Sequence, residues 1–359
     1  MRDNHPGPFY PNRRMLVYAG QLPGVQFDAI ANRQVGAVMF SMPYLKLKTK
    51  GETVGWWYTQ ALPRLQEWSQ YRYLDSGVFT LMRKAKVGKV SIKNSSIKAG
   101  KSTRRRPHTG TGGGEGRLRG GPVKAVTSTK GLLPMSEISD LYREYTQYLE
   151  ENLDDWDFVV NLDVDALEFE KDNGTIVPGH EVMLATNERL LRLCGPKLLP
   201  VWHPSMDQEQ TYWKVLLDEF KYVAIGSDVK PTERVVKYAC DQAHNAGVMV
   251  HGLGVASAEH LRLVAFDTAD SSSWTHGVQY GNYPVVHYPT RAKTPYGISQ
   301  RWLEKKVAEF GYDPAILLER SRGDVRKLQF EVGIALLQER EASIPPISTK
   351  TITRTTLYE

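Results

Sequence analysis

The chain has 359 residues, of which 41% are hydrophobic, so it can bury a large core and is not a disordered protein. Its two cysteines, Cys194 and Cys240, lie far apart and outside any CxxC pattern, which argues against a disulfide framework. The polar N-terminus does not resemble a signal peptide, and no apolar run is long enough to cross a bilayer. These features predict a single domain over residues 1–359, located in the cytoplasm and without a membrane segment.

The positive charge of the chain is concentrated in one segment. The net charge is +6, but residues 83–130 hold fourteen Lys and Arg residues against one acid, Glu115. That segment contributes about +13, so the rest of the chain sums to about −7, the difference between 6 and 13. Because the segment is also rich in Gly and Ser and poor in large apolar residues, it predicts a flexible insertion.

Eight short apolar segments alternate with amphipathic stretches of helical period. They are residues 15–20, 36–41, 72–77, 158–163, 198–203, 222–227, 248–254 and 263–270. Near-continuous apolar strands are typical of a parallel sheet that is covered on both faces. The alternation predicts an α/β fold, a (β/α)8 TIM barrel, with a doubly wound open sheet as the alternative.

Two regions lie outside this alternation. The basic insertion, residues 83–130, follows the third predicted strand, which would place it on the rim of the barrel where active sites are built. After the last strand, the pattern predicts two helices, over 299–309 and about 323–340, and then an extended tail over 341–359.

Most of the predicted strands end in polar or small residues. These strand ends include Asp75-Ser76-Gly77, Asp163, His203, Gly226, His251-Gly252 and Asp270. Since barrel active sites are built from the carboxyl ends of strands, these positions are candidates for binding and catalysis. The alternative is that polarity simply returns where a strand ends.

Two of these aspartates are the candidate catalytic residues. Asp75, in YLDSGVF, would lie over the barrel mouth, with the backbone N–H groups of Ser76 and Gly77 free for a ligand; the alternative is an Asx-type turn. Asp270, in FDTADSSSW, could attack C1′ of a sugar, although Asp267 is the other choice and a polar turn is again the alternative. One carboxylate would attack while the other handles protons.

The remaining candidates would hold a flat ligand. Asp163 could accept hydrogen bonds from the edge of a purine-like base, with Asp165 as the other choice. Gly226 and Gly252 would allow the backbone to approach such a ligand closely. His203 and His251 could serve a metal, but HxH, HExxH and Walker A patterns are absent from the sequence, so we expect no metal and no nucleotide cofactor.

Together these segments resemble the queuine/guanine transglycosylase superfamily between about Tyr73 and Gly277. YLDSGVF is similar to the family's Asp-Ser-Gly-Gly-Phe segment, and AIGSD and HGLGV are similar to its glycine turns after strands six and seven. VWHP, which contains His203, stands where the family has a base-binding segment. The resemblance implies that Asp270 is the nucleophile, that Asp75 works in base exchange and that Asp163 contacts the incoming base.

The sequence also departs from the commonest family pattern. The nucleophile segment is Asp270-Ser-Ser-Ser-Trp rather than Asp-Cys-Val-x-Pro-Thr-Arg, and the zinc-binding Cys/Cys/Cys/His set of the tRNA enzymes is absent. Both departures are more similar to the phage DNA 7-deazaguanine transglycosylases, which protect phage DNA from restriction. The resemblance implies replacement of guanine in DNA by a 7-deazaguanine such as a preQ0-type base, in the host cytoplasm if a phage encodes the chain.

The basic insertion fits a polyanionic partner. Its arginines would contact phosphates, and those we single out are Arg104, Arg105, Arg106, Arg117 and Arg119. The alternative is a solvated insertion without a partner. Three rival functions stay open: a tRNA-guanine transglycosylase, a metal-free glycosidase, and a nucleic-acid-binding barrel without catalysis.

Overall fold

The structure of the protein is a computed structural model. It describes residues 15–20, 24–42, 47–49, 52–54, 60–78, 131–165, 167–204, 207, 210–226, 233–254, 258–275, 278, 300–317, 319 and 322–344. The basic insertion from residue 83 to residue 130, with its five singled-out arginines, lies outside these residues, as does most of the predicted tail.

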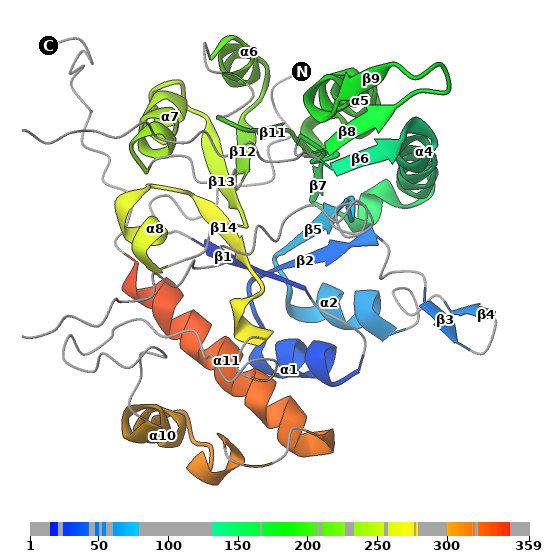
Figure 1. The fold of residues 1–359 in the computed structure, drawn as a ribbon. Helices are drawn as coiled ribbons and strands as arrows, with labels where there is room; N and C mark the ends of the chain where they lie inside the picture. Colours follow the sequence, from blue (N-terminus) through cyan, green and yellow to red (C-terminus); the bar gives the residue numbers. More distant parts are fainter. Residues whose placement is uncertain are drawn as a thin grey trace, which may run out of the picture.

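The centre of the molecule is a sheet of nine parallel strands in a mixed α/β fold (Figure 1). In spatial order the strands are β10-β7-β5-β2-β1-β14-β13-β12-β11. Their bounds are β1 Met15–Ala19, β2 Ala37–Ser41, β5 Tyr71–Asp75, β7 Phe158–Val160, β10 Leu198–Leu199, β11 Val201–Trp202, β12 Tyr222–Gly226, β13 Met249–Leu253 and β14 Thr268–Ser271.

The two edges of this sheet are consecutive pieces of one segment, so the sheet is nearly closed and barrel-like. β10 pairs with β7, β11 pairs with β12, and only Pro200 separates the two edge strands. Proline has no N–H to donate, which interrupts the ladder at this residue. Its carbonyl is still used, because it accepts a hydrogen bond from the Ala224 N–H at 2.8 Å.

Each of the eight predicted strand segments overlaps at least one strand of this sheet. The last one begins later than predicted, at Thr268, because Ala258–Leu263 forms helix α8. Val264 and Phe266 lie in the connection from that helix to the strand and are buried. Their apolar side chains therefore reflect packing in the core rather than membership of a strand. The alternation of apolar residues therefore located the sheet but not this boundary.

Alternate residues of the strands point to opposite faces and build two apolar layers. One layer fills the interior of the sheet; its buried members are Val17, Ala37, Met39, Tyr73, Phe158, Val160, Leu199, Val201, Tyr222 and Ala224. The other lies between the sheet and the helices and is larger. The strands are short and apolar on both faces because both faces are covered.

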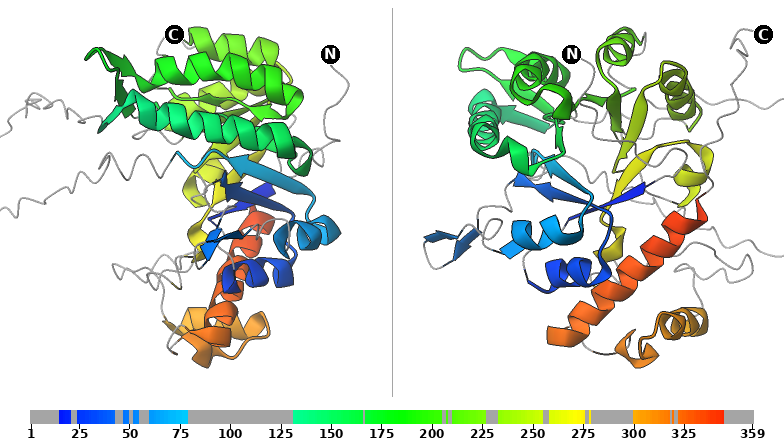
Figure 2. Two further views of the ribbon diagram at one scale, coloured as in Figure 1. Left: turned by 90° about the vertical axis from the view of Figure 1, so that its right-hand side faces the viewer. Right: turned by 180° about the vertical axis from the view of Figure 1, so that it is seen from behind.

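Helices surround the sheet on its outer side (Figure 2). Their bounds are α1 Val25–Arg33, α2 Leu62–Trp68, α4 Met135–Asn152, α5 Gly179–Cys194, α6 Thr211–Glu219, α7 Glu233–Asn245, α8 Ala258–Leu263, α10 Gln300–Glu309 and α11 Gly323–Ser343. The two C-terminal helices confirm the prediction, except that α11 continues to Ser343, three residues into the stretch predicted to be extended.

The last helix, α11, is fastened to the first elements of the chain. It packs along α1, and the Leu16 N–H of β1 donates a hydrogen bond to Glu341 Oε1 at 3.1 Å. Asn32 donates to Glu331 at 2.8 Å, and Arg33 donates to Gln338 at 2.6 Å. The two ends of the described chain therefore close onto each other.

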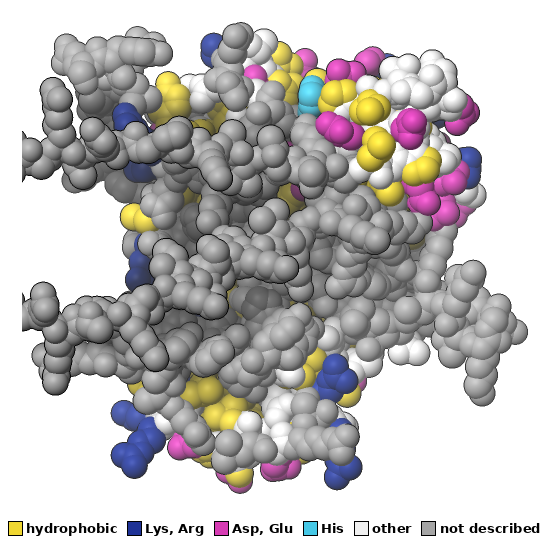
Figure 3. Space-filling view, viewed as in Figure 1, with side chains coloured by type: hydrophobic (Ala, Val, Ile, Leu, Met, Phe, Trp, Pro, Cys, Tyr) yellow, Lys and Arg dark blue, Asp and Glu magenta, His cyan; other side chains and the backbone are white. Residues whose placement is uncertain are grey.

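Two small sheets, which the sequence analysis did not predict, flank the large one. β3 (Leu47–Thr49) and β4 (Glu52–Val54) form a hairpin, while β6 (Gly131–Pro134), β8 (Leu167–Glu170) and β9 (Ile176–Pro178) form a three-stranded sheet near α4 and α5. Hydrophobic and acidic side chains lie side by side over this second sheet (Figure 3). Its exposed apolar side chains include Leu132 and Ile176.

No helix among the described residues is both long enough and apolar enough to span a membrane.

Candidate active site

Asp75 is the last residue of β5 and lies beside the end of the neighbouring strand. Ser41, its register partner at the end of β2, donates a hydrogen bond to Asp75 Oδ2 at 2.6 Å. The Gly77 N–H also donates to this carboxylate. The prediction that the Gly77 N–H is free for a ligand is therefore wrong, because Asp75 makes the Asx-type turn that was the alternative. Gly77 itself has a φ of 79°, which favours glycine at this position.

The turn does not remove Asp75 from consideration as an acid or base. Burial raises the pKa of the Asp75 carboxyl from 3.8 to about 6, against the opposing effect of the hydrogen bonds from Ser41 and Gly77. The negative charges of Asp163 and Asp270 raise this pKa further. A carboxyl with a pKa near 6 can exchange protons close to neutral pH.

Asp270 lies on β14, and its side chain is 12% exposed. Its Oδ1 accepts a hydrogen bond from the Gly254 N–H, which follows β13. The His251 Nε2 atom lies 3.5 Å from the same oxygen. The Gly254 N–H and the His251 imidazole, both from the neighbouring strand segment, therefore face the same oxygen of this carboxylate.

The sheet brings together three aspartates that are far apart in sequence. Asp75 ends β5, Asp163 follows β7 and Asp270 is the last residue but one of β14, and the charges of Asp163 and Asp270 act on Asp75. No Lys or Arg of the described residues forms an ion pair with any of the three. Like charges brought together without such a partner raise carboxyl pKa values and are typical of functional sites.

Asp267 does not belong to this group. It precedes β14, at the opposite end of the sheet, and accepts hydrogen bonds from the Val250 N–H at 2.7 Å and from His244 Nε2 at 3.0 Å. Its own N–H donates to the Val250 carbonyl at 2.9 Å. Asp267 ties α7 and β13 to β14, so the choice between the two aspartates falls on Asp270.

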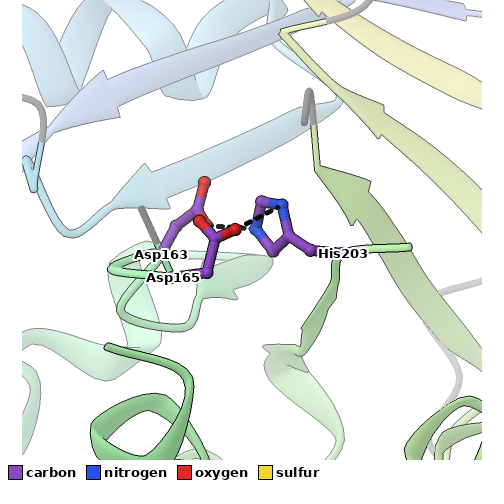
Figure 4. Close-up of side chains that lie close together, drawn as sticks. All are labelled: Asp163, Asp165 and His203. Carbon is purple, nitrogen blue, oxygen red and sulfur yellow. Dashed lines mark hydrogen bonds and ion pairs between the residues drawn. The ribbon is translucent and has the colours of Figure 1, made fainter. Parts of the chain in front are cut away.

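His203 lies between two carboxylates that come from another loop (Figure 4). It follows β11, is 3% exposed, and its Nε2 contacts Asp163 Oδ1 while its Nδ1 lies 3.4 Å from Asp165 Oδ2. The Asp163 side chain is 23% exposed and that of Asp165 is 9% exposed. Asp163 is therefore the more accessible of the two carboxylates to a ligand.

These three side chains could also hold a cation. One ligand atom from each of Asp163, Asp165 and His203 lies within 4.8 Å of the others. Two carboxylate oxygens and one imidazole nitrogen suit a divalent transition metal. However, both ring nitrogens of His203 face carboxylates, so a metal would have to displace one of these contacts.

The two glycines predicted to approach a ligand are closely covered by aromatic rings. A Cβ atom on Gly226 would lie 2.1 Å from Cε1 of His203, so glycine here leaves room for the imidazole between the two aspartates. A Cβ atom on Gly252 would lie 3.1 Å from the Phe266 ring. Contact of either backbone with a ligand remains a prediction.

Ser76 is fully buried, and its hydroxyl has no hydrogen-bond partner among the described residues. A buried hydroxyl without a partner is costly in a folded protein, so it marks a place where a ligand or water would be bound. Its proximity to Asp75 keeps it a candidate for substrate binding.

A buried layer of polar side chains lies directly below the aspartates. The sequence motifs did not predict this layer. The Tyr73 hydroxyl lies 3.0 Å from that of Tyr222, which contacts Thr268 Oγ1, and Thr268 Oγ1 lies 2.6 Å from His251 Nδ1. Burial raises the pKa of both phenols, so they stay neutral. The alternation of inward-facing residues on β5, β12, β13 and β14 was the available signal.

Comparisons with known proteins add no functional assignment. No protein-family model matches the chain, and no curated protein matches it. One solved structure, the BexX/CysO complex of Amycolatopsis orientalis, aligns with 97% of this chain and 98% of its own at 10% identity, with a TM-score of 0.37. A likeness this weak supports no inference about fold or function.

Proposed function

We propose that this protein is a (β/α)8-barrel transglycosylase that replaces guanine in DNA with a 7-deazaguanine base. In the proposed fold, β10 and β11 would count as one strand interrupted at Pro200, so that the nine strands correspond to the eight of such a barrel. The single observation that carries the proposal is the convergence of Asp75, Asp163 and Asp270 at one end of the sheet. The sequence resemblance assigns a role in base exchange to the same three residues.

Asp270 would be the nucleophile. Its carboxylate attacks C1′ of the target nucleotide, so a C1′–O bond forms while the C1′–N9 bond to guanine breaks. The nucleotide must first leave the base stack, at a cost of a few kcal/mol. The product is an ester between the deoxyribose and Asp270.

Asp75 would move the proton in both directions. As an acid it protonates the departing guanine, and as a base it accepts the N9 proton of the incoming 7-deazaguanine, whose N9 then displaces Asp270 from C1′. A pKa of about 6 makes both forms accessible near neutral pH. One N-glycosidic bond replaces another, so the reaction needs no ATP.

Asp163 would hold the base. Its oxygens can accept hydrogen bonds from ring and amino N–H groups, as acidic side chains do at base edges. His203 contacts Asp163 and fixes its orientation, and His203 is itself seated against Gly226. The basic segment of residues 83–130 would bind DNA phosphates and make binding strongly salt-dependent.

The experiment that tests the proposal measures incorporation of labelled base. The protein is incubated with duplex DNA or tRNA and with radiolabelled 7-deazaguanines, including a preQ0-type base. We expect label in DNA with the wild type and none with Asp270→Ala. Label in tRNA alone would reject DNA as the substrate, and no label in either nucleic acid would reject base exchange.

A further inference from the structure

The imidazole of His251 lies inside the sheet, directly below Asp270, and has one nitrogen without a hydrogen bond. His251 is fully buried, and its Nε2 has no hydrogen-bond partner within the described part of the chain. Asp270 Oδ1 is 3.5 Å from this atom. A shift of a few tenths of an ångström would turn that contact into a hydrogen bond.

The other side of the ring is firmly held. Nδ1 lies 2.6 Å from Thr268 Oγ1, its register neighbour on β14, and 3.3 Å from the Tyr222 hydroxyl. The ring also stacks on Tyr73, with centroids 5.6 Å apart. The groups that face His251 are therefore two neutral phenols, one hydroxyl and one carboxylate.

This environment selects the tautomer of the ring. A bare Nε2 lone pair facing an ionised Asp270 would be repelled, whereas an Nε2–H can donate to it. Nδ1 then accepts from the Thr268 hydroxyl, which accepts from Tyr222, which accepts from Tyr73. The whole chain of hydroxyls is satisfied in that direction.

We infer that His251 is a positioning residue that anchors Oδ1 of Asp270 and leaves Oδ2 as the attacking atom. The inference rests on the proposed function. Oδ1 accepts a hydrogen bond from the Gly254 N–H and lies 3.5 Å from His251 Nε2, while no hydrogen bond to Oδ2 is found among the described residues. In the ester, Oδ2 is bonded to C1′ and Oδ1 is the carbonyl oxygen.

The two donors contribute differently to the two halves of the reaction. In the first half they hold the carboxylate in the orientation for attack. In the second half the C1′–Oδ2 bond breaks and the electron pair returns to the carboxylate, where donors at Oδ1 stabilise the growing charge. Loss of the His251 donor should therefore slow release of the ester more than its formation.

A pair of variants tests this. His251→Phe keeps a ring against Tyr73 but has no donor, and we expect base exchange to fall about 100-fold, with a larger fraction of protein trapped as a covalent DNA adduct on denaturing gels. His251→Gln offers an N–H close to the position of Nε2 and should recover at least part of the rate. Equal rates and equal adduct fractions in the wild type and His251→Phe would overturn the inference.

A second measurement does not depend on the reaction. In protein with 15N-labelled histidine, NMR should show His251 as the Nε2–H tautomer, and Asp270→Asn should shift its Nε2 resonance. The Nδ1–H tautomer would overturn the inference even if base exchange occurs. Conversely, wild-type protein that exchanges no base while showing the expected tautomer would reject the proposed function alone.

Discussion

The two ends of the sheet treat their aspartates differently. At the amino end, Asp157 accepts hydrogen bonds from both the backbone and the side chain of Arg72, and Asp267 is bonded to His244 and the Val250 N–H. At the carboxyl end, Asp75, Asp163 and Asp270 come together without a Lys or Arg partner from the described chain. The first arrangement ties neighbouring elements of the fold together, while the second leaves three carboxylates near one another without a counter-charge from the described residues.

Removing a carboxylate from each end should separate these roles. Asp270→Asn should lower base exchange by about 10⁴-fold or more, as expected for loss of a nucleophile. The fold should be preserved, because the amide oxygen of the new side chain can still accept from the Gly254 N–H. Incorporation of labelled 7-deazaguanine into DNA measures the rate, and near-normal exchange would exclude Asp270 as the nucleophile.

The matched change at the amino end is Asp267→Ala. It leaves the Val250 N–H and His244 without their shared acceptor, which should lower the free energy of unfolding by about 1–3 kcal/mol. Urea unfolding monitored by tryptophan fluorescence measures this loss. Exchange per folded molecule should be unchanged, and a selective loss of activity would contradict the division between the two ends.

Protonation of Asp75 should make stability depend on pH. Its folded-state pKa, about 6, lies above the ordinary 3.8, so its proton stabilises the fold fully below about pH 3.8, and that contribution is lost as the pH rises through about 6. The shift corresponds to at most roughly 3 kcal/mol. Asp75→Asn should abolish this decrease in the free energy of unfolding with rising pH. Unfolding curves measured between pH 4 and 7 for both proteins would show the difference.

The same group should appear in the pH profile of the reaction. We expect a limb near pH 6 in the rate of base exchange with the wild type, and a low rate without that limb in Asp75→Asn. A limb that persists in the variant would assign the titration to another group.

The position of the His203 ring can be changed without mutating either of the carboxylates that it contacts. Gly226→Ala places a Cβ atom 2.1 Å from Cε1 of the ring, so the imidazole must move away from Asp163. We expect a loss of about 1–3 kcal/mol in unfolding free energy and a higher KM for the base. Gly36→Ala is the control, because its Cβ atom would meet nothing closer than 3.8 Å.

Metal removal should have the smallest effect. Both ring nitrogens of His203 already face Asp163 and Asp165, so chelator treatment should change neither the unfolding midpoint nor the exchange rate. Stoichiometric metal in elemental analysis that disappears in Asp165→Ala would show that the cluster is a metal site instead.

The features that the sequence predicted are those with a local signature, whereas contacts between residues far apart in the chain were missed. Strand segments such as 222–227 were located because buried parallel strands have a local apolar signature. The strands β6 and β8 were missed because GLLP and LEFE are too short to show a period. Asp75 and Asp270 were found through their local motifs, and the resemblance favoured the second over Asp267.

The contacts around these residues could not be predicted in the same way. The pairing of Asp163 with His203 joins side chains 40 residues apart, and the polar layer below Asp270 draws on four strands. His251 looked like a strand-end residue, but β13 continues to Leu253, which places His251 inside the sheet. Register, which is set by the whole sheet, decides such positions.

The fastening of α11 to β1 has a consequence for how the protein is made. The Leu16 N–H and Glu341 are 325 residues apart, so this bond has to wait until Glu341 has left the ribosome. Nascent chains that stop before α11 would leave α1 without its covering helix. The β1 and α1 segment is thus among the last parts of this fold to be completed, although it is synthesised before α11, and chaperone binding to truncated chains should be strongest there.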